Sequence, residues 1–339
     1  MIYYRPIAMN DAARPAGAMP LAGGWLWFDR VEVLARGRPA RLMPAADLPY
    51  DRAALLTAAR PILAGLDLAR PRVMGVLNVT PDSFSDGGRF FEADAALMQA
   101  QVMARDADLL DIGGESTRPG AAEVLLAEEV ARVAPVIAAL RKGGVGVPIS
   151  VDTRKAAVAE AALDAGADLV NDVAALAFDP ALGPLVAARG VPVVLMHSIA
   201  TPATMQNDPR YEDVLLDVYD ALAARIAASE AMGIARQRIV VDPGIGFGKT
   251  AAHNLTLLRG LALFHGLGCP VLIGASRKRF IGTIGRAEAP EARLPGSLAV
   301  ALAGVAQGAQ ILRVHDVAET RQALRLWRAS TGPEREDRT

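Results

Sequence analysis

Polar side chains recur at the ends of short apolar runs, and three of them form a set that could bind a ligand. Asp152, Asn171 and Asp242 each close such a run. A carboxylate accepts hydrogen bonds from N–H groups, and an amide both donates and accepts them. Together they could bind the flat edge of a heterocycle that carries an amino and an amide group. For each residue alone, the alternative is an N-cap of the helix that follows, a common role of Asp and Asn.

The last two apolar runs end in basic residues. Arg313 and His315 alternate with Val314, so both side chains are expected on the same face of a strand. An arginine and a histidine at one point could clamp an anion. Ser276 to Lys278 close the preceding run, and barrels often bind phosphate beside their seventh and eighth strands. The alternatives are a salt bridge for Arg313 and a buried, hydrogen-bonded imidazole for His315.

Two long polar loops follow the first two runs. Asn78 to Gly88 reads NVTPDSFSDGG, and Gly113 to Ala121 reads GGESTRPGA. An ordinary turn between a strand and a helix has roughly 2–6 residues, so these loops are more typical of binding loops. The Asn78 side-chain oxygen could bind Mg²⁺. The second loop offers N–H groups, hydroxyls and a guanidinium, which suit phosphate oxygens.

The segment DPGIGFGKT resembles a nucleotide P-loop but lacks its first glycine. Pro243 stands where that glycine is required, so the pattern favours a role for Asp242 instead. His197 ends the fifth run. It could either line the wall of a binding site or act as a ligand in it. His253 and His265 are expected to be exposed on the helix after the sixth run. No His or Cys spacing indicates zinc.

These residues need a scaffold that brings strand ends together. Eight apolar runs alternate with helical segments: VMGVLN, DLLDIGGESTR, PISVD, DLVND, VPVVLMH, RIVVD, PVLIGASRK and QILRVH. Strands that alternate with helices predict a parallel sheet, and eight such units predict an α/β fold, the (β/α)8 TIM barrel. The carboxyl ends of the strands then form one face, which is where such barrels carry their active sites.

The chain divides into three parts. Residues 1–70 are expected to be an N-terminal extension, with a β-hairpin in WLWFDRVEVLARGRPARLM and a helix from Asp51 to Leu63 that ends or kinks at Pro61. The extension is expected to pack against the barrel or a second subunit. Residues 71–330 are the predicted barrel, and residues 331–339 a frayed tail.

Composition narrows the class of protein. The chain has 339 residues, 52% of them hydrophobic, and a net charge of -1, so no basic excess indicates nucleic acid. We expect no membrane span and no signal peptide. A single cysteine, Cys269, excludes an internal disulfide and favours a cytoplasmic location. Gly296 to Gly308 carries no charge, which predicts a homodimer interface unless the extension covers this helix.

The ordered motifs resemble those of the dihydropteroate synthase family. They are NVTPDSFSDGG, GGESTRPGA, SVDT, NDV, LMH, DPGIGFGK, GASRKRFIG, RLPGSLA and RVHD, and they span Arg72 to Arg328. The segment HSIATPATMQ departs from the form expected after the fifth strand. The resemblance implies an enzyme that condenses 6-hydroxymethyl-7,8-dihydropterin diphosphate with p-aminobenzoate. It also implies Mg²⁺ as cofactor and binding of sulfonamide-type analogues.

The resemblance further assigns roles by motif. It implies that the pterin is bound by Asp152, Asn171, Met196, Asp242, Gly274 and Lys278. It implies that the diphosphate is bound by Asn78, Thr117, Arg313 and His315, with Mg²⁺ at Asn78. It implies that p-aminobenzoate is bound by Thr117, Pro119, Phe247, Ser276 and Lys278. The residues implied as catalytic are Asp152, Lys278, Arg313 and His315.

The residues support that chemistry. Departure of diphosphate leaves positive charge on the pterin methylene, which Asp152 and Asp242 could stabilise. Arg313 and His315 could stabilise the departing anion, and an arylamine needs no strong base. Two alternatives stay open: a pterin-dependent methyltransferase, which would not need the anion clamp, and a non-catalytic pterin-binding paralogue, which would be expected to lack loop residues or Lys278.

Overall fold

Eight parallel strands form the centre of the molecule. The structure, a computed structural model, describes residues 1–79, 89–116, 123–199 and 209–331, and of residues 89–94 only the backbone. The eight strands are β6 (Arg72–Asn78), β7 (Leu109–Gly113), β8 (Ile149–Asp152), β9 (Leu169–Asp172), β10 (Val193–Met196), β11 (Ile239–Asp242), β12 (Leu272–Ile273) and β13 (Ile311–Val314). Each lies within one of the eight predicted apolar runs, except that β6 begins one residue earlier, at Arg72.

The sheet closes into a barrel. Its strand order is β11-β10-β9-β8-β7-β6-β13-β12, with every pairing parallel. A further parallel bridge between Val241 and Val271 joins β11 to the chain that enters β12. The predicted (β/α)8 barrel is therefore confirmed. Closure brings strand ends that are distant in sequence, such as Asn78 of β6 and Val314 of β13, to one end of the barrel.

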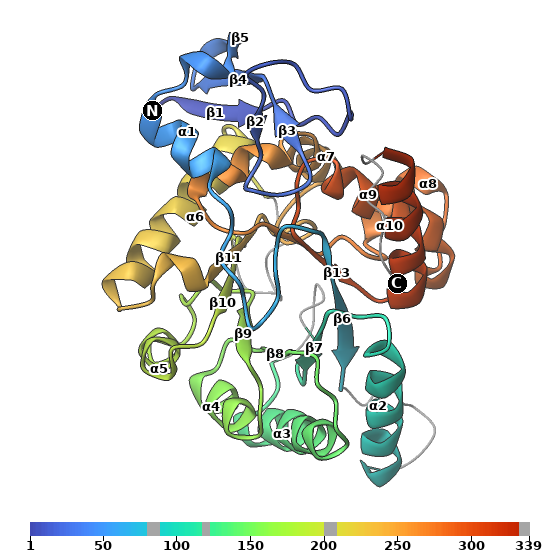
Figure 1. The fold of residues 1–339 in the computed structure, drawn as a ribbon. Coiled ribbons are helices and arrows are strands. Elements are labelled where there is room, and N and C mark those ends of the chain that lie inside the picture. Colours follow the sequence, from blue (N-terminus) through green and yellow to red (C-terminus); the bar gives the residue numbers. More distant parts are fainter. Residues whose placement is uncertain (80–88, 117–122, 200–208, 332–339) are drawn as a thin grey trace.

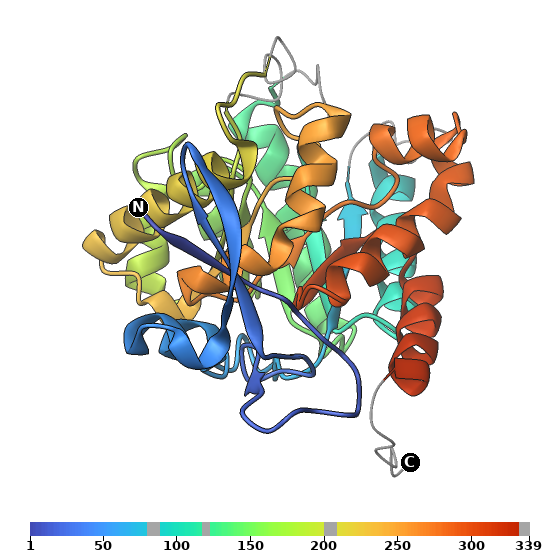
Figure 2. The same ribbon diagram turned by 90° about the horizontal axis from the view of Figure 1, so that it is seen from above.

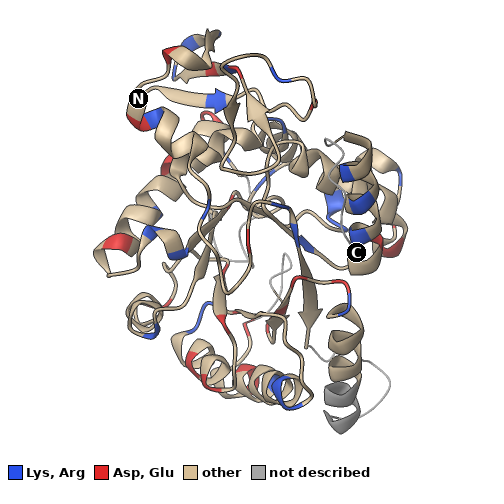
Figure 3. Cartoon of the chain, in the orientation of Figure 1, with Lys and Arg blue, Asp and Glu red and all other residues tan. Residues whose placement is uncertain are grey.

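Helices surround the strands, as Figure 1 shows. They are α2 (Arg89–Met103), α3 (Leu126–Lys142), α4 (Ala156–Asp164), α5 (Leu182–Arg189), α6 (Val214–Ala231), α7 (Ala251–Arg259), α8 (Arg279–Gly285), α9 (Leu294–Val305) and α10 (Val317–Thr331). Short 3-10 helices are η3 (Arg236–Arg238), η4 (Leu261–Leu267) and η5 (Pro290–Arg293). Acidic and basic residues are interspersed over these elements (Figure 3), as the small net charge predicts.

The interior of the barrel is packed with side chains from the strands. Its buried cluster takes one residue from each of seven strands: Met74, Leu109, Leu169, Val194, Val240, Leu272 and Ile311. Leu63 and Leu68, from the segment that leads into β6, complete this cluster. The interior is thus a filled core rather than a channel, which leaves the loops at the strand ends to form a site.

The N-terminal extension forms two small sheets, β1-β4-β5 and β2-β3, beside the barrel (Figures 1 and 2). Its strands are β1 (Tyr3–Pro6), β2 (Met19–Pro20), β3 (Trp27–Phe28), β4 (Arg30–Ala35) and β5 (Arg38–Pro44), followed by η1 (Ala45–Asp47). β4 and β5 pair antiparallel and confirm the predicted hairpin. Strand β1 lies along β4.

The predicted helix of the extension is shorter than expected. Helix α1 spans Tyr50–Thr57, so the prediction that it reaches Leu63 was wrong. The carbonyl of Leu56 accepts the backbone N–H of Ala22, and that of Leu55 accepts Nη1 of Arg60. These tertiary bonds replace the next helical turn, which frees the following residues to run under the barrel.

Ion pairs and aromatic contacts attach the extension to the barrel. Arg36, in the β4–β5 turn, contacts Asp217 at 2.6 Å and Asp220 at 2.8 Å, both on α6. The Tyr3 hydroxyl donates to Asp220 at 2.8 Å. Trp25 Nε1 donates to the Val305 carbonyl, at the end of α9, at 3.2 Å. The extension therefore contacts the predicted dimer helix at one end.

One side of the uncharged helix α9 packs against its own chain, and the other side is exposed. Ala301 is 6% exposed, whereas Ala299 and Ala303 are exposed. Ala301 therefore does not lie on an outward face. No helix among the described residues is long and apolar enough to cross a membrane. The predicted frayed tail beyond Thr331 lies outside the described residues.

Candidate active site

Three polar residues meet around Arg313 at the carboxyl ends of the strands. Arg313, on β13, donates from Nε to Asp111 Oδ2 at 2.5 Å and from Nη2 to Asp152 Oδ2 at 2.6 Å. Asn171 Nδ2 donates to the same Asp111 oxygen at 3.0 Å. The alternative of a salt bridge for Arg313 is therefore realised. A guanidinium has five N–H donors, so these two bonds do not exhaust its capacity to bind an anion.

The negative charge of Asp152 is energetically unfavourable in this buried position. Burial raises the pKa of Asp152 to about 7; Arg313 opposes the shift and the carboxylate of Asp111 adds to it. Burial alone would lower the pKa of Arg313, but Asp111 and Asp152 outweigh it and raise that pKa. Oδ1 of Asp111 and Oδ1 of Asp152 are buried and accept no hydrogen bond from any described residue. Both acids thus retain an acceptor for a ligand N–H.

Asp242 lies on the other side of Arg313. A methyl group at Gly274 would lie 3.7 Å from the Arg313 side chain and 4.0 Å from Asp242 Oδ2, which places these residues together. Asp242 Oδ1 accepts the backbone N–H of Gly244 at 2.8 Å. Burial raises the pKa of Asp242, and the Lys278 ammonium opposes that shift. Met196, on β10, is paired in register with Asp242 on β11, and it is 3% exposed.

Lys278 lies between the loop after β11 and an aromatic ring. Its Nζ donates to the Ile245 carbonyl and lies 4.4 Å from the centroid of Phe247. Burial lowers the pKa of Lys278 to about 7, and the carboxylate of Asp242 opposes this shift. Gly246 has φ +83°, and a Cβ there would lie 2.8 Å from Lys278 Cδ. Only glycine lets this loop run so close to the lysine.

His315 and Ser276 tie the last two strands together. The Ser276 hydroxyl lies 3.1 Å from His315 Nδ1 and 3.3 Å from its backbone nitrogen. Arg277, between Ser276 and Lys278, pairs with Asp316 through Nε at 3.0 Å. These contacts fix the loop after β12 beside β13. They do not test the predicted anion clamp, which stays a prediction.

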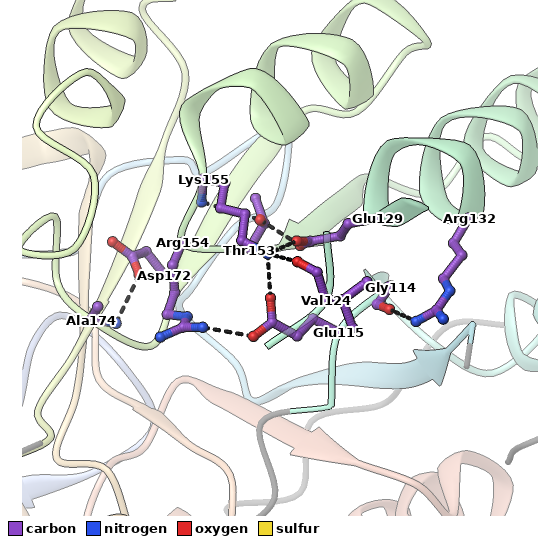
Figure 4. A network of polar contacts seen from close by, with 10 residues as sticks. All are labelled: Gly114, Glu115, Val124, Glu129, Arg132, Thr153, Arg154, Lys155, Asp172 and Ala174. Carbon is purple, nitrogen blue, oxygen red and sulfur yellow. Dashed lines mark hydrogen bonds and ion pairs between the residues drawn. The ribbon is translucent and has the colours of Figure 1, made fainter. Parts of the chain in front are cut away.

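A second group of buried charges includes the three residues that follow Asp152 in the chain (Figure 4). We call it the Lys155 network: Glu115, Glu129, Thr153, Arg154 and Lys155. Lys155 Nζ donates to Glu115 at 2.7 Å, Glu129 at 2.8 Å and the Val124 carbonyl at 2.6 Å. Arg154 donates to Glu115 at 2.6 Å, and Thr153 to Glu129 at 2.7 Å. Two basic and two acidic groups balance one another, so this network is a scaffold.

The structure brings most of the predicted residues to one place. Joined by the contacts above are Asp152, Asn171, Met196, Asp242, Phe247, Gly274, Lys278 and Arg313, with Ser276 and His315 on the adjoining loop and strand. Asn78 ends β6 and lies beside Gly113 in register, which leaves its predicted metal role untested. Thr117 and Pro119 lie outside the described residues, as does most of each predicted binding loop.

Two site residues were given no binding role in the sequence analysis. Asp111 lies inside β7 rather than at its end, but a charged residue within the apolar run LLDIG was the available signal. Lys249 was set aside with the P-loop resemblance, yet it is 3% exposed and lies 3.0 Å from His197 Nδ1. The exposure predicted for His265 was wrong: it is 0% exposed, because η4 packs under the barrel and the extension.

A cavity of about 560 Å³ lies at the opposite end of the barrel. Arg141 and Asp168 line it. Arg141 already donates to Asp168 and to the carbonyls of Val145, Val147 and Gly166. Its charges are therefore satisfied within the protein, which makes this cavity a weaker candidate than the strand ends.

Comparison with known proteins shows the family of the chain. The family described as "Pterin binding enzyme" matches residues 74–315. The dihydropteroate synthase of Neisseria meningitidis serogroup B is 51% identical over 272 residues, and that of Escherichia coli K12 is 47% identical over 266 residues. Each match covers 78% of this chain, and 94% and 93% of the relative. A probable bifunctional folylpolyglutamate synthase/dihydropteroate synthase of Haloferax volcanii is 48% identical, but the chain spans only 31% of its length.

Solved structures give the same result. A Xanthomonas albilineans dihydropteroate synthase with 4-aminobenzoic acid has a TM-score of 0.76 and 48% identity, and the match covers 81% of this chain and 99% of that one. The same enzyme with 7,8-dihydropteroate has a TM-score of 0.72 and 47% identity, with 79% and 97% covered. A Yersinia pestis dihydropteroate synthase with a sulfonamide drug has a TM-score of 0.74 and 48% identity, with 78% and 96% covered.

Proposed function

The chain belongs to the pterin binding enzymes and, among them, to the dihydropteroate synthases, and we infer that its reaction takes place at the barrel mouth described above. It is a transferase of folate biosynthesis. It condenses 6-hydroxymethyl-7,8-dihydropterin diphosphate with p-aminobenzoate to give 7,8-dihydropteroate and diphosphate. The observation that carries the assignment to this site is the pair of unpaired acceptor oxygens on Asp111 and Asp152 beside Asn171.

The pterin is proposed to bind across these acids. Its amino and amide N–H groups would donate to carboxylate oxygens of Asp152 and Asp242, and Asn171 would bind the adjoining edge. A ligand donor would satisfy the buried Oδ1 of Asp152, which otherwise carries a desolvation cost. Met196, Gly274 and the alkyl part of Lys278 would line the ring. The carboxylates then face the position where positive charge develops.

The leaving group is proposed to lie at Arg313 and His315. The C–O bond between the pterin methylene and the diphosphate breaks, and both bonding electrons leave with the diphosphate. N–H donors of Arg313 beyond the two that bind Asp111 and Asp152 would neutralise this anion. The imidazole of His315, oriented by Ser276, would donate from its other nitrogen. Thr117 is proposed as a further ligand.

Mg²⁺ is the proposed cofactor. The Asn78 side chain would give it one hard oxygen ligand, and no group of three or more acidic, His or Cys side chains within the described ranges is placed to hold a metal. This donor set fits an ion that keeps waters and binds largely through substrate phosphates. When bound, Mg²⁺ would withdraw charge from the departing diphosphate.

p-Aminobenzoate is proposed to lie against Phe247, Ser276 and Lys278, near Pro119. Its amino nitrogen attacks the methylene carbon with its lone pair, forms the C–N bond and then loses a proton to solvent. The Lys278 ammonium, held over the Phe247 ring, would attract its carboxylate. Sulfonamide-type analogues are proposed to compete for this position. A cytoplasmic location is proposed from the single, free Cys269.

Product analysis tests the assignment. The purified protein, incubated with the pterin diphosphate, p-aminobenzoate and Mg²⁺, is expected to form dihydropteroate and diphosphate in equal amounts. Chelation of Mg²⁺ should slow the reaction without unfolding the protein. Pterin binding without product would indicate a non-catalytic paralogue. Methyl transfer from a methylated pterin, again without dihydropteroate, would indicate a methyltransferase.

A homodimer through α9 is also proposed. This helix carries no charge, and its small residues Ala299 and Ala303 are exposed. Sedimentation of the full chain should give a dimer, and Ala303→Glu should dissociate it. Ala301→Glu is not a suitable probe because Ala301 is buried within its own chain. A monomer at micromolar concentration would exclude this interface.

A further inference from the structure

Lys249 joins the loops that follow β10 and β11. Its Nζ lies 2.9 Å from the Phe247 carbonyl, 3.3 Å from the His197 carbonyl and 3.0 Å from His197 Nδ1. An ammonium has three N–H donors and no acceptor, so three acceptors match it fully. The mechanism proposed above does not use this residue.

His197 is suited to accept from this lysine. Burial, and secondly the nearby Lys249 charge, lower the pKa of His197 to about 3, so its ring is neutral at pH 7. The hydrogen-bond pattern then assigns the ring proton to Nε2 and leaves Nδ1 as the acceptor. The lysine thus binds two backbone carbonyls and one ring nitrogen, none of which can donate to the others.

The two loops are in close backbone contact at this point. Gly244 has φ +68°, and a Cβ there would lie 2.0 Å from the His197 carbonyl oxygen. Without a donor between them, the carbonyls of His197 and Phe247 and the His197 ring nitrogen would face one another as unpaired acceptors. Lys249 therefore holds together two segments that would otherwise repel.

This arrangement costs stability. Lys249 is 3% exposed and forms no ion pair with a carboxylate anywhere in the described part of the chain. Burial lowers the pKa of Lys249 to about 7. The carboxylate of Asp242 opposes this shift, and the ammonium of Lys278 adds to it. A buried charge without an ionic partner carries a desolvation cost that an apolar side chain would not have.

Composition makes the choice of lysine informative. The chain has 36 basic residues, but lysine stands only at positions 142, 155, 249 and 278. Two of the four are buried and Lys278 is half-buried, all three at the carboxyl end of the barrel. In a chain that otherwise uses arginine, a buried lysine indicates that the position needs a compact ammonium with three divergent donors.

We propose that Lys249 is a positioning residue for the arylamine substrate: it fixes the Phe247 backbone to His197 and so holds the Phe247 ring under the Lys278 ammonium. The inference rests on the proposed function, because it assigns that ring to the p-aminobenzoate side of the site. Removal of the tie lets the loop from Pro243 to Gly248 shift, and the ring and the Lys278 ammonium lose their mutual position. Asp152 and Asn171, on β8 and β9, are not held by this tie.

Steady-state kinetics of Lys249→Met test the proposal. The KM for p-aminobenzoate should rise roughly tenfold, the size expected for loss of a charge-assisted contact. The KM for the pterin diphosphate should change less than about threefold, within the scatter of indirect effects. The melting temperature should change little, because methionine removes the cost of a buried charge but leaves the three acceptors without a donor.

A double-mutant cycle with Phe247→Ala separates positioning from packing. If Lys249 acts through the Phe247 ring, Lys249→Met should add less than about twofold to the KM for p-aminobenzoate once that ring is absent. Additive effects, equal rises in both KM values, or a lower melting temperature with unchanged KM values would each overturn the proposal. A parent protein that forms no dihydropteroate would instead overturn the proposed function.

Discussion

Two buried lysines at the same end of the barrel have opposite surroundings. Lys155 contacts Glu115 and Glu129, and these carboxylates outweigh burial and raise its pKa (Figure 4). Lys249 contacts two carbonyls and a neutral imidazole, and burial lowers its pKa to about 7. The first charge is balanced inside the protein. The second is bound by neutral acceptors and forms no ion pair within the described residues.

The same contrast separates the acids. Both oxygens of Glu115 accept hydrogen bonds from Arg154 and Lys155. Asp111 and Asp152 each retain one buried oxygen that no described residue binds. Closed polar networks stabilise a fold, whereas unsatisfied buried acceptors carry a cost that a ligand can relieve. Charge balance therefore distinguishes the scaffold from the binding surface, although both are equally buried.

The largest effect on stability is expected from Lys155→Met. The substitution leaves Glu115 and Glu129 buried without a shared cation, which should lower the free energy of unfolding by about 3–5 kcal/mol. Urea denaturation measures it, and Lys142→Met, at an exposed position, is the matched control with an expected change within ~0.5 kcal/mol. If the two variants are equally stable, the Lys155 network is not the closed scaffold described here.

His315→Ala should act on binding instead of folding. It removes a donor to the diphosphate but leaves the ion pairs of Arg313 intact, so the affinity for the pterin diphosphate should fall by about 1.5–3 kcal/mol. Arg313→Ala should weaken binding similarly but also destabilise, because Asp111 and Asp152 lose their partner. Calorimetry with the pterin diphosphate measures both. Unchanged affinity in His315→Ala would count against the anion clamp.

The pH dependence of stability gives a smaller test. The folded pKa of Asp152 is raised to about 7, so the folded state binds the extra proton and stability falls as pH rises toward 7. The folded pKa values of Lys249 and Lys278 are lowered to about 7, so the unfolded state binds more protons above pH 7 and stability rises from pH 7 to 10.

Lys249→Met should flatten the alkaline rise by an amount on the order of 1 kcal/mol per pH unit. His197, Asp242 and Lys278 face the same group, and they are unchanged in this variant. Chemical denaturation at pH 8 and pH 10 measures the slope. A variant whose slope matches the parent would show that Lys249 is not a buried, titrating cation.

Sequence patterns predicted the barrel because each strand is a local apolar run with a polar end. They placed Asp152, Asn171 and Asp242 correctly at those ends. Asp111 was missed because its partners, Asn171 and Arg313, lie 60 and 202 residues away and only barrel closure brings them to it. Lys249 was missed because its local motif resembles a phosphate loop.

The residues at which helices end, and the sides that helices expose to solvent, were harder to predict from the sequence. Helix α1 ends at Thr57 because Ala22, more than 30 residues earlier, takes a carbonyl that the next turn would use. The buried side of α9, which includes Ala301, could not be predicted because an uncharged helix has no polar stripe to mark its exposed side, and packing against the barrel decides it. Tertiary contacts of this kind leave no local signal in the sequence.

Asp152→Asn tests most directly the claim that the unbalanced charges serve the reaction. Asparagine removes a costly buried charge, and Arg313 keeps Asp111 as a partner, so the free energy of unfolding should stay constant or rise. Turnover per folded molecule should fall by roughly a hundredfold, because the developing cation loses its carboxylate. A collapsed melting temperature with normal turnover per folded molecule would show that Asp152 belongs to the scaffold.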